Sequence, residues 1–201
     1  MFDPIKPVKV ITITSEKGPT KVMYPKIVGM KDKKVEGQIN KDIRKLVNSL
    51  KEEAEEPDTS VNISYTIKVN RKGVLSLIIL LDFYKEHAAH PMQVQKALTF
   101  STLTGQNFTF PELFNPTSYY KTRLTRYVSD HIKAEKIPVF DQPPKVTDKQ
   151  EYYLTDQTLV LFYQIYDYTP YAYGFLEIPI PFDTVMQMLS RNSPIRQLTS
   201  R

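Results

Sequence analysis

The amino-acid sequence predicts an α+β fold, a mostly antiparallel sheet with two long helices and a short C-terminal helix packed on it. Three observations predict it. Segments with alternating apolar residues recur along the chain, and several are joined by short turns. Residues 33–53 and 116–136 instead place apolar residues at helical spacing. A shorter stretch of helical spacing closes the chain after Phe182.

Composition limits the possible classes of protein. The chain has 201 residues, which favours a single domain over 1–201, with halves of about 1–92 and 93–190 and a polar, frayed tail over 191–201. It contains no cysteine, so disulfides and thiolate metal sites are excluded. Its 41% apolar and 24% charged residues are typical of a globular protein. The net charge of +5 indicates at most a weak preference for acidic partners, and we predict no nucleic-acid partner.

The N-terminal segment is predicted to form two strands followed by a helix. Residues 8–14 and 21–28 alternate, and Pro25 restricts the second strand to an edge or a bulge. Asp32 is a suitable N-cap for the helix over 33–53. The acidic run over 52–58 is either a binding segment or a solvated helix end.

Residues 61–114 form the middle of the predicted sheet. The strand over 61–69 alternates cleanly, whereas the strand over 74–83 is apolar on both faces and should be central. Residues 94–100 and 106–110 flank Leu103-Thr104-Gly105 and predict a hairpin.

The second half begins with one helical turn over 111–114. Asn115 and Pro116 then predict the start of the helix over 116–136, and a proline-containing connector follows over 137–146. Residues 151–154 and 158–166 predict a second hairpin. A last strand over 176–180 leads into the closing helix over 182–189.

His87 and His90 are weak candidates for metal ligands. They lie in the connection after the strand over 74–83, and Glu86 or Asp82 would have to supply a third ligand. The alternative is structural, with one imidazole bonding backbone and the other facing water. The chain has neither a G-x-S-x-G motif nor a glycine-rich phosphate loop. We therefore identify no catalytic residues, no enzyme activity and no cofactor.

The segment Tyr166–Gly174 is a candidate contact surface, because it holds four tyrosines and a proline. Tyrosine offers a large contact area at low entropic cost, together with a polar tip. We predict that Tyr168, Pro170, Tyr171, Tyr173 and His90 contact a partner. The alternative is that these rings cover the open end of the sheet as peripheral core.

Several motifs carry a resemblance to a known family. They are the His90 segment, LTFSTLTG over 98–105, ELF over 112–114 and TPYAYG over 169–174. Residues 10–189 resemble the RsiV-like extracellular domain family, which includes the domain of the lysozyme-sensing anti-sigma factor RsiV and the N-terminal domain of the peptidoglycan deacetylase PdaC. Members usually have GGAH where this chain has HAAH, with His87 and Ala88 in the glycine positions. The resemblance implies an α+β fold and a binding role in the bacterial cell wall.

Three hypotheses for function follow. The first is a non-catalytic sensor or binding module for a lysozyme-like protein or a peptidoglycan glycan. The second is a metal-assisted hydrolase at His87 and His90 that acts on cell-wall material. The third is an intracellular protein that shares only the fold. The first residues contain no signal peptide and the chain contains no membrane-spanning run, so we expect a soluble protein that is cytoplasmic as written, or at the cell wall if a leader was removed.

Overall fold

The computed structural model describes residues 5–200 and divides into two compact units, Met1–Asn107 and Phe108–Arg201. The predicted α+β fold and its mostly antiparallel pairing are confirmed, but the strands form two sheets, one in each unit. Within residues 5–200, no helix has the length and apolar character needed to cross a bilayer.

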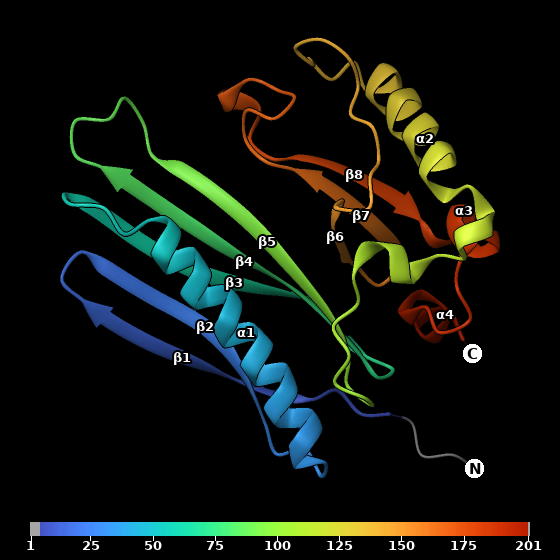
Figure 1. Cartoon of the computed structure of the whole chain (residues 1–201), viewed down its shortest axis with the longest axis horizontal. Helices are drawn as coiled ribbons and strands as arrows, with labels where there is room; N and C mark the ends of the chain where they lie inside the picture. The colour runs from blue at the N-terminus through green and yellow to red at the C-terminus, as the bar shows by residue number, and fades with distance from the viewer. Residues whose placement is uncertain (1–4, 201) are drawn as a thin grey trace. The chain divides into compact units, whose positions relative to one another are not determined.

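The first unit is a five-stranded sheet with one helix across a face (Figure 1). Its strands, in sheet order, are β1 (Lys9–Lys17), β2 (Thr20–Val28), β3 (Thr59–Arg71), β4 (Val74–Lys85) and β5 (Met92–Ser101). Neighbours are antiparallel except β2 and β3, which pair in parallel. The helix α1 (Lys33–Glu53) connects those two strands, as a parallel pair requires.

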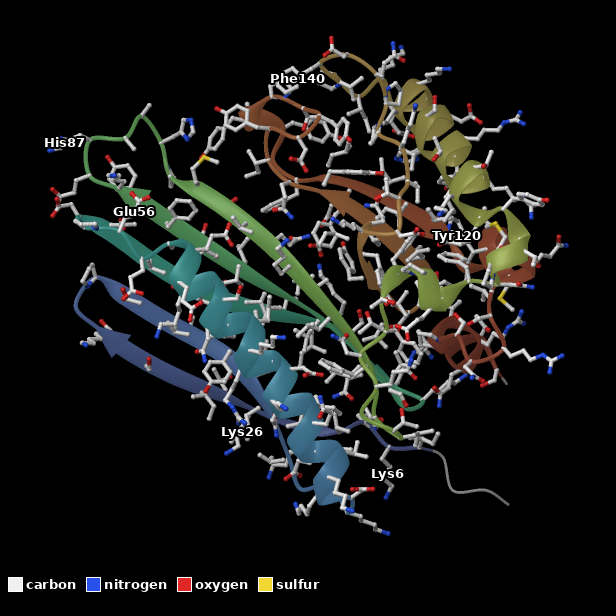
Figure 2. All side chains as sticks on the ribbon, viewed as in Figure 1. Lys6, Lys26, Glu56, His87, Tyr120 and Phe140 are labelled. Carbon is white, nitrogen blue, oxygen red and sulfur yellow. The ribbon has the colours of Figure 1, made fainter. Side chains whose placement is uncertain are left out.

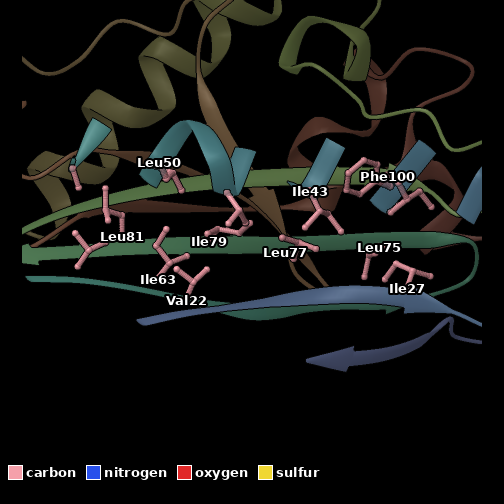
Figure 3. Packing of buried hydrophobic residues seen from close by; sticks show 14 of the residues in the cluster. Val22, Ile27, Ile43, Leu50, Ile63, Leu75, Leu77, Ile79, Leu81 and Phe100 are labelled. Carbon is pink, nitrogen blue, oxygen red and sulfur yellow. The ribbon is translucent and has the colours of Figure 1, made fainter. Parts of the chain in front are cut away.

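The helix α1 has the predicted bounds, because its N-cap residue and the spacing of its apolar residues both indicate the same helix. The Asp32 carboxylate accepts the backbone N–H groups of Lys34 and Val35. The apolar face packs on the sheet, where β4 is the most buried strand, as expected (Figure 3). Fully buried residues of this core include Ile39, Ile43, Leu50, Ile63, Leu75, Leu77, Ile79, Leu81 and Phe100.

The ladder between β2 and β3 is short, and an asparagine compensates for it. Only Thr20–Val22 pair with β3, so Pro25 lies outside this ladder and its missing N–H removes no bond to β3. Farther along β2, the Asn40 side chain accepts from the Ile27 N–H and donates to the Ile27 carbonyl, both at 2.8 Å. The helix thus supplies the backbone partners that β3 does not.

The hairpin predicted over 94–110 forms only in part. After β5, the Gly105 N–H donates to the Ser101 carbonyl and closes a turn, but a single bridge joins Phe100 to Asn107. A 3₁₀ turn, Phe110–Leu113, follows at once, begun by a capping box between Thr109 and Glu112. That capping box ends the extended conformation before a second strand can form.

The second unit is a three-stranded antiparallel sheet. Its strands are β6 (Glu151–Leu154), β7 (Thr158–Tyr163) and β8 (Leu176–Pro181), so β7 ends earlier than predicted. The helix α2 (Tyr120–Ala134) buries Tyr120, Leu124, Val128 and Ile132, and the Tyr127 hydroxyl donates to the Pro179 carbonyl of β8. A cluster of buried rings completes the core, made of Phe110, Phe114, Tyr120 and Tyr152.

The predicted helix over 116–136 is interrupted at its start. Asn115 caps only a 3₁₀ turn, Pro116–Ser118, because Tyr119 then adopts a left-handed conformation with φ 54°. The chain turns at Tyr119, and α2 begins one residue later. The interruption separates the exposed Tyr119 from the buried Tyr120.

The C-terminal segment is also more ordered than predicted. The closing helix is a single turn, α3 (Phe182–Val185), continued by a 3₁₀ turn over Met186–Met188. The prediction of a frayed tail over 191–201 is wrong for α4 (Pro194–Thr199), which buries Pro194, Ile195 and Leu198. The Arg196 guanidinium donates to the carbonyls of Met186 and Leu189. These hydrogen bonds hold α4 against the segment that precedes it.

Candidate binding surface

The tyrosine-rich loop, residues 166–174, lies between β7 and β8. It begins at Tyr166, which adopts a left-handed φ of 71°, a conformation that costs a tyrosine free energy. A 3₁₀ turn follows over Tyr171–Tyr173. The loop ends at Gly174 with φ 79° and ψ −149°, a combination available almost only to glycine.

Buried contacts hold this loop in place. Thr169 is fully buried, and the Tyr168 ring meets the Tyr163 ring edge to face with centroids 5.2 Å apart. The Asp167 carboxylate accepts the Gln164 N–H at 2.9 Å, which closes the turn after β7. The Tyr168 carbonyl accepts the Phe140 N–H at 2.9 Å and so joins the connector to the loop.

The outer surface of the loop is aromatic. Tyr166 is 46% exposed and Tyr173 is 41% exposed, and the half-buried Tyr171 ring lies 5.6 Å from the Tyr166 ring. Pro170 is exposed between them. Phe140, labelled in Figure 2, lies in the connector and is 55% exposed, and its backbone N–H is the group that donates to the loop carbonyl of Tyr168. We did not predict Phe140, because an irregular connector gives no spacing from which its neighbours can be inferred.

The other predicted contact residue, His90, belongs to the first unit. It lies in the connection between β4 and β5, and its Nδ1–H donates to the Pro91 carbonyl at 3.0 Å. His87 is exposed in the same connection, and its φ of 67° is one that glycine adopts without strain (Figure 2). Position 87 therefore has a backbone conformation that favours glycine although it carries histidine. Among residues 5–200, no three His, Asp or Glu side chains come together as a metal site.

Two hollows adjoin the tyrosine-rich loop. One of about 350 Å³ lies beside Tyr173 and is lined by the end of α2 and by β8, with His131, Glu135 and Glu177 among its residues. The other, of about 360 Å³, is the Tyr163 hollow, lined by Lys145, Thr147, Lys149, Gln150, Glu151, Phe162, Tyr163, Gln164, Asp167 and Tyr168. Both hollows are built entirely from the second unit.

The first unit has a larger hollow of about 800 Å³ at the end of α1. Its lining is acidic and includes Glu52, Glu55, Glu56, Asp58 and Glu86. Lys85 lies 2.7 Å from the Glu56 carboxylate, and this hydrogen bond lowers the pKa of Glu56. The acidic run over 52–58 is therefore a helix end and loop that borders a hollow.

Burial raises the pKa of two tyrosines of the three-stranded sheet. It raises the pKa of Tyr163 well above its usual range, with a smaller effect from the neighbouring Tyr168. It also raises the pKa of Tyr153, and the Glu177 carboxylate adds to the shift. Both phenols therefore stay protonated further into the alkaline range than an ordinary tyrosine does.

The comparisons with known proteins agree with this fold. Residues 111–183 match the family model described as protein of unknown function DUF3298. These residues include α2, the connector, all three strands of the second unit and the tyrosine-rich loop. No curated protein matches the chain.

Two solved structures of DUF3298 proteins are similar to the chain. The first, from Bacteroides fragilis, has a TM-score of 0.70 at 16% identity and covers 96% of both chains. The second, from Pseudomonas aeruginosa, has a TM-score of 0.68 at 14% identity and covers 93% of this chain and 96% of the other. At these identities, the likeness establishes a shared fold.

Proposed function

We propose that this chain is a non-catalytic binding module in which the tyrosine-rich loop contacts a protein partner. The observation that carries the proposal is a loop with an aromatic outer surface and a buried inner side. Tyr166 and Tyr173 are each more than 40% exposed, whereas Thr169 is fully buried. A tyrosine side chain has few rotatable bonds, so a surface of tyrosine rings loses little conformational entropy when it binds.

The backbone of the loop supports the same proposal. Tyr166 holds a left-handed φ, and Gly174 holds a combination of φ and ψ that is restricted to glycine. Unfavourable backbone conformations concentrate at binding sites, where the surrounding structure holds them in place. Here the surrounding contacts are the Tyr163–Tyr168 ring pair and the Phe140–Tyr168 hydrogen bond.

The resemblance to RsiV-like domains adds a class of partner. We propose that the DUF3298 match extends to the whole chain as an RsiV-like domain, and that the partner is a lysozyme-like protein. His90 is a further proposed contact from the first unit. A peptidoglycan glycan is the other partner that this resemblance implies, and the experiment below includes it.

The test is a binding assay of the full chain against immobilised lysozyme and against insoluble peptidoglycan. We expect lysozyme to retain the wild-type protein but not the Tyr173→Ala variant. The matched control is Tyr119→Ala, because Tyr119 is 79% exposed in the same unit but outside the loop. Equal retention of both variants, or no retention of the wild type by lysozyme, would contradict the proposal.

A further inference from the structure

Strand β1 forms one edge of the five-stranded sheet, and its outer side has no neighbouring strand (Figure 1). It pairs with β2 along its whole length, Lys9–Lys17, without a shift of register. Backbone N–H and C=O groups along such an edge are available to another extended chain. No residue of β1 takes part in the proposed function, so this edge is independent of the tyrosine-rich loop.

The hairpin turn after β1 fixes which of its backbone groups face outward. Gly18 has φ 57° and is followed by Pro19, whose ring holds φ at about −65°, and this combination is typical of a type II′ turn. A two-residue turn of this type closes on a hydrogen-bonded pair, here Lys17 and Thr20. Hydrogen-bonded pairs alternate with non-bonded pairs along an antiparallel ladder. The outward groups therefore belong to Val10, Thr12, Thr14 and Glu16.

Two further observations agree with this assignment. Thr12 lies opposite Pro25, which has no N–H and therefore suits a non-bonded pair. Within residues 5–200, the backbone groups of the four outward-facing residues form no hydrogen bond outside the β1–β2 ladder. An extended chain can therefore add to the sheet at this edge through the same kind of bonds that join β1 to β2.

The middle of β1 lacks the features that protect exposed edges in most proteins. Protected edges are short, or they carry charges, prolines or bulges. Residues 10–15 are uncharged, contain no proline and are mostly β-branched, and the Ile11 side chain is 39% exposed. The other edge strands of the two sheets are protected: β5 carries Lys96, β6 has only four residues, and β8 contains Pro179 and Pro181.

The side-chain pattern of β1 suits a second copy of the same chain. Across a two-fold axis, outward-facing residues must lie opposite outward-facing residues. An axis centred on Thr12 meets this condition and places Ile11 opposite the partner's Ile13 in a non-bonded pair, where side chains approach most closely. The two-fold axis repeats the contact, so four isoleucines gather on one face of the new pair. We propose that two copies associate through antiparallel pairing of their β1 strands, centred on Thr12.

Neighbouring registers are less favourable. An axis centred on Ile13 would place Lys9 opposite the partner's Lys17, and like charges that lie opposite each other are destabilising. An axis centred on Ile11 would place Lys9 opposite the partner's Ile13. Pairing of two short edges buries less surface than a standard interface, so the Kd of the dimer should be on the order of 100 µM.

The first test is sedimentation equilibrium of the full chain between about 10 and 1,000 µM. We expect the average mass to rise from 23.3 kDa toward twice that value. Thr14→Pro removes an outward N–H from each copy and leaves the β1–β2 ladder intact, so it should raise the Kd at least about ten-fold. Thr14→Val keeps the N–H and is the matched control. A monomeric wild type, or equal dimerisation of the two variants, would overturn the proposal.

Engineered cysteines test the register directly, because the chain has no cysteine of its own. Thr12→Cys places two thiols opposite each other at the axis, with Cα atoms about 5.5 Å apart, which a disulfide can span. Ser15→Cys is the matched control, because Ser15 would lie opposite the partner's Lys9 and its two thiols would be about 20 Å apart. Under mild oxidation, we expect a covalent dimer of Thr12→Cys and a monomer of Ser15→Cys. Equal crosslinking of the two variants, or crosslinking of neither, would contradict this pairing.

Discussion

The Asn40 side chain on α1 bonds both backbone groups of Ile27 on β2, at 2.8 Å each. Asn70 repeats this arrangement with the N–H and carbonyl of Val8, at 2.9 and 2.8 Å. The two sites differ in burial, since Asn40 is 7% exposed whereas Val8 and Asn70 are only partly buried. Water can therefore replace Asn70 more readily than Asn40.

Asn40→Ala should destabilise the protein strongly. It leaves the N–H and carbonyl of Ile27 buried without partners, which should lower the free energy of unfolding by about 2–5 kcal/mol. Asn70→Ala is the matched control and should cost about 1 kcal/mol, because water reaches Val8. Urea unfolding measures both, and equal losses would show that the burial argument is incorrect.

Tyr119→Gly should stabilise the protein. Tyr119 has a left-handed φ of 54° and a side chain that is 79% exposed, so glycine relieves the backbone without removing packing. Glycine also loses more conformational entropy on folding than tyrosine does, so the net increase in the free energy of unfolding should be about 0.5–1 kcal/mol. Thermal unfolding tests this, and a lower melting temperature would mean that the Tyr119 ring has contacts we have not recognised.

Gly174→Ala should destabilise the protein, whereas Gly37→Ala should stabilise it. No atom lies within 4 Å of a Cβ added at either position, so only the backbone differs. Alanine at Gly174 must adopt φ 79° and ψ −149°, at a cost of about 1–3 kcal/mol. Gly37 is an exposed position in α1, and alanine there should instead raise the free energy of unfolding by about 0.5–1 kcal/mol. Chemical denaturation of the two variants provides the comparison, and a stable Gly174→Ala protein would show that the loop adapts.

The pH dependence of stability should include a contribution from the Tyr120–Asp148 pair. Burial, followed by the hydrogen bond to Asp148, raises the pKa of Tyr120 to about 12. The folded state therefore favours the protonated phenol, whose contribution is present below pH 10 and is lost as pH rises toward 12. Tyr120→Phe should flatten this alkaline part of the stability curve. An unchanged slope would contradict the assigned pKa.

The carboxylate of the same pair acts at acidic pH. The hydrogen bond from Lys121, and then that from Tyr120, lowers the pKa of Asp148 below its usual value near 4. Its contribution is therefore present at neutral pH and is lost as pH falls through the lowered pKa. Asp148→Asn should reduce the fall in melting temperature below about pH 4. If the acid transition stays the same, other carboxylates determine it.

The sequence predicted those elements in which local signals agree. Asp32 and the apolar period of α1 both indicated the same helix, and the apolar run of β4 indicated an interior strand. The missed features depend on contacts or backbone conformations that sequence periodicity does not encode. Tyr119 interrupts a helix whose apolar spacing continues through it, and Arg196 fixes a tail that looks polar in sequence.

The candidate site was predicted only in part, because some of its features depend on contacts between segments that are distant in the sequence. The tyrosine content of residues 166–174 indicated a contact surface, and the structure gives Tyr173 and Pro170 exposed positions there. The backbone of Phe140 is linked to this loop only by a hydrogen bond between segments that lie far apart in the sequence. The Tyr163 hollow combines residues from segments that are separate in the sequence, so it is visible only in the fold.

The most direct test of the proposed function measures lysozyme affinity and melting temperature together for the wild type, Tyr171→Ala and Tyr173→Ala. The proposal predicts that both variants lose at least about ten-fold in affinity, as expected for aromatic contact residues, while the melting temperature barely changes. A large fall in melting temperature would instead show that these rings stabilise the end of the sheet. Unchanged affinity in both variants would contradict the proposed binding surface.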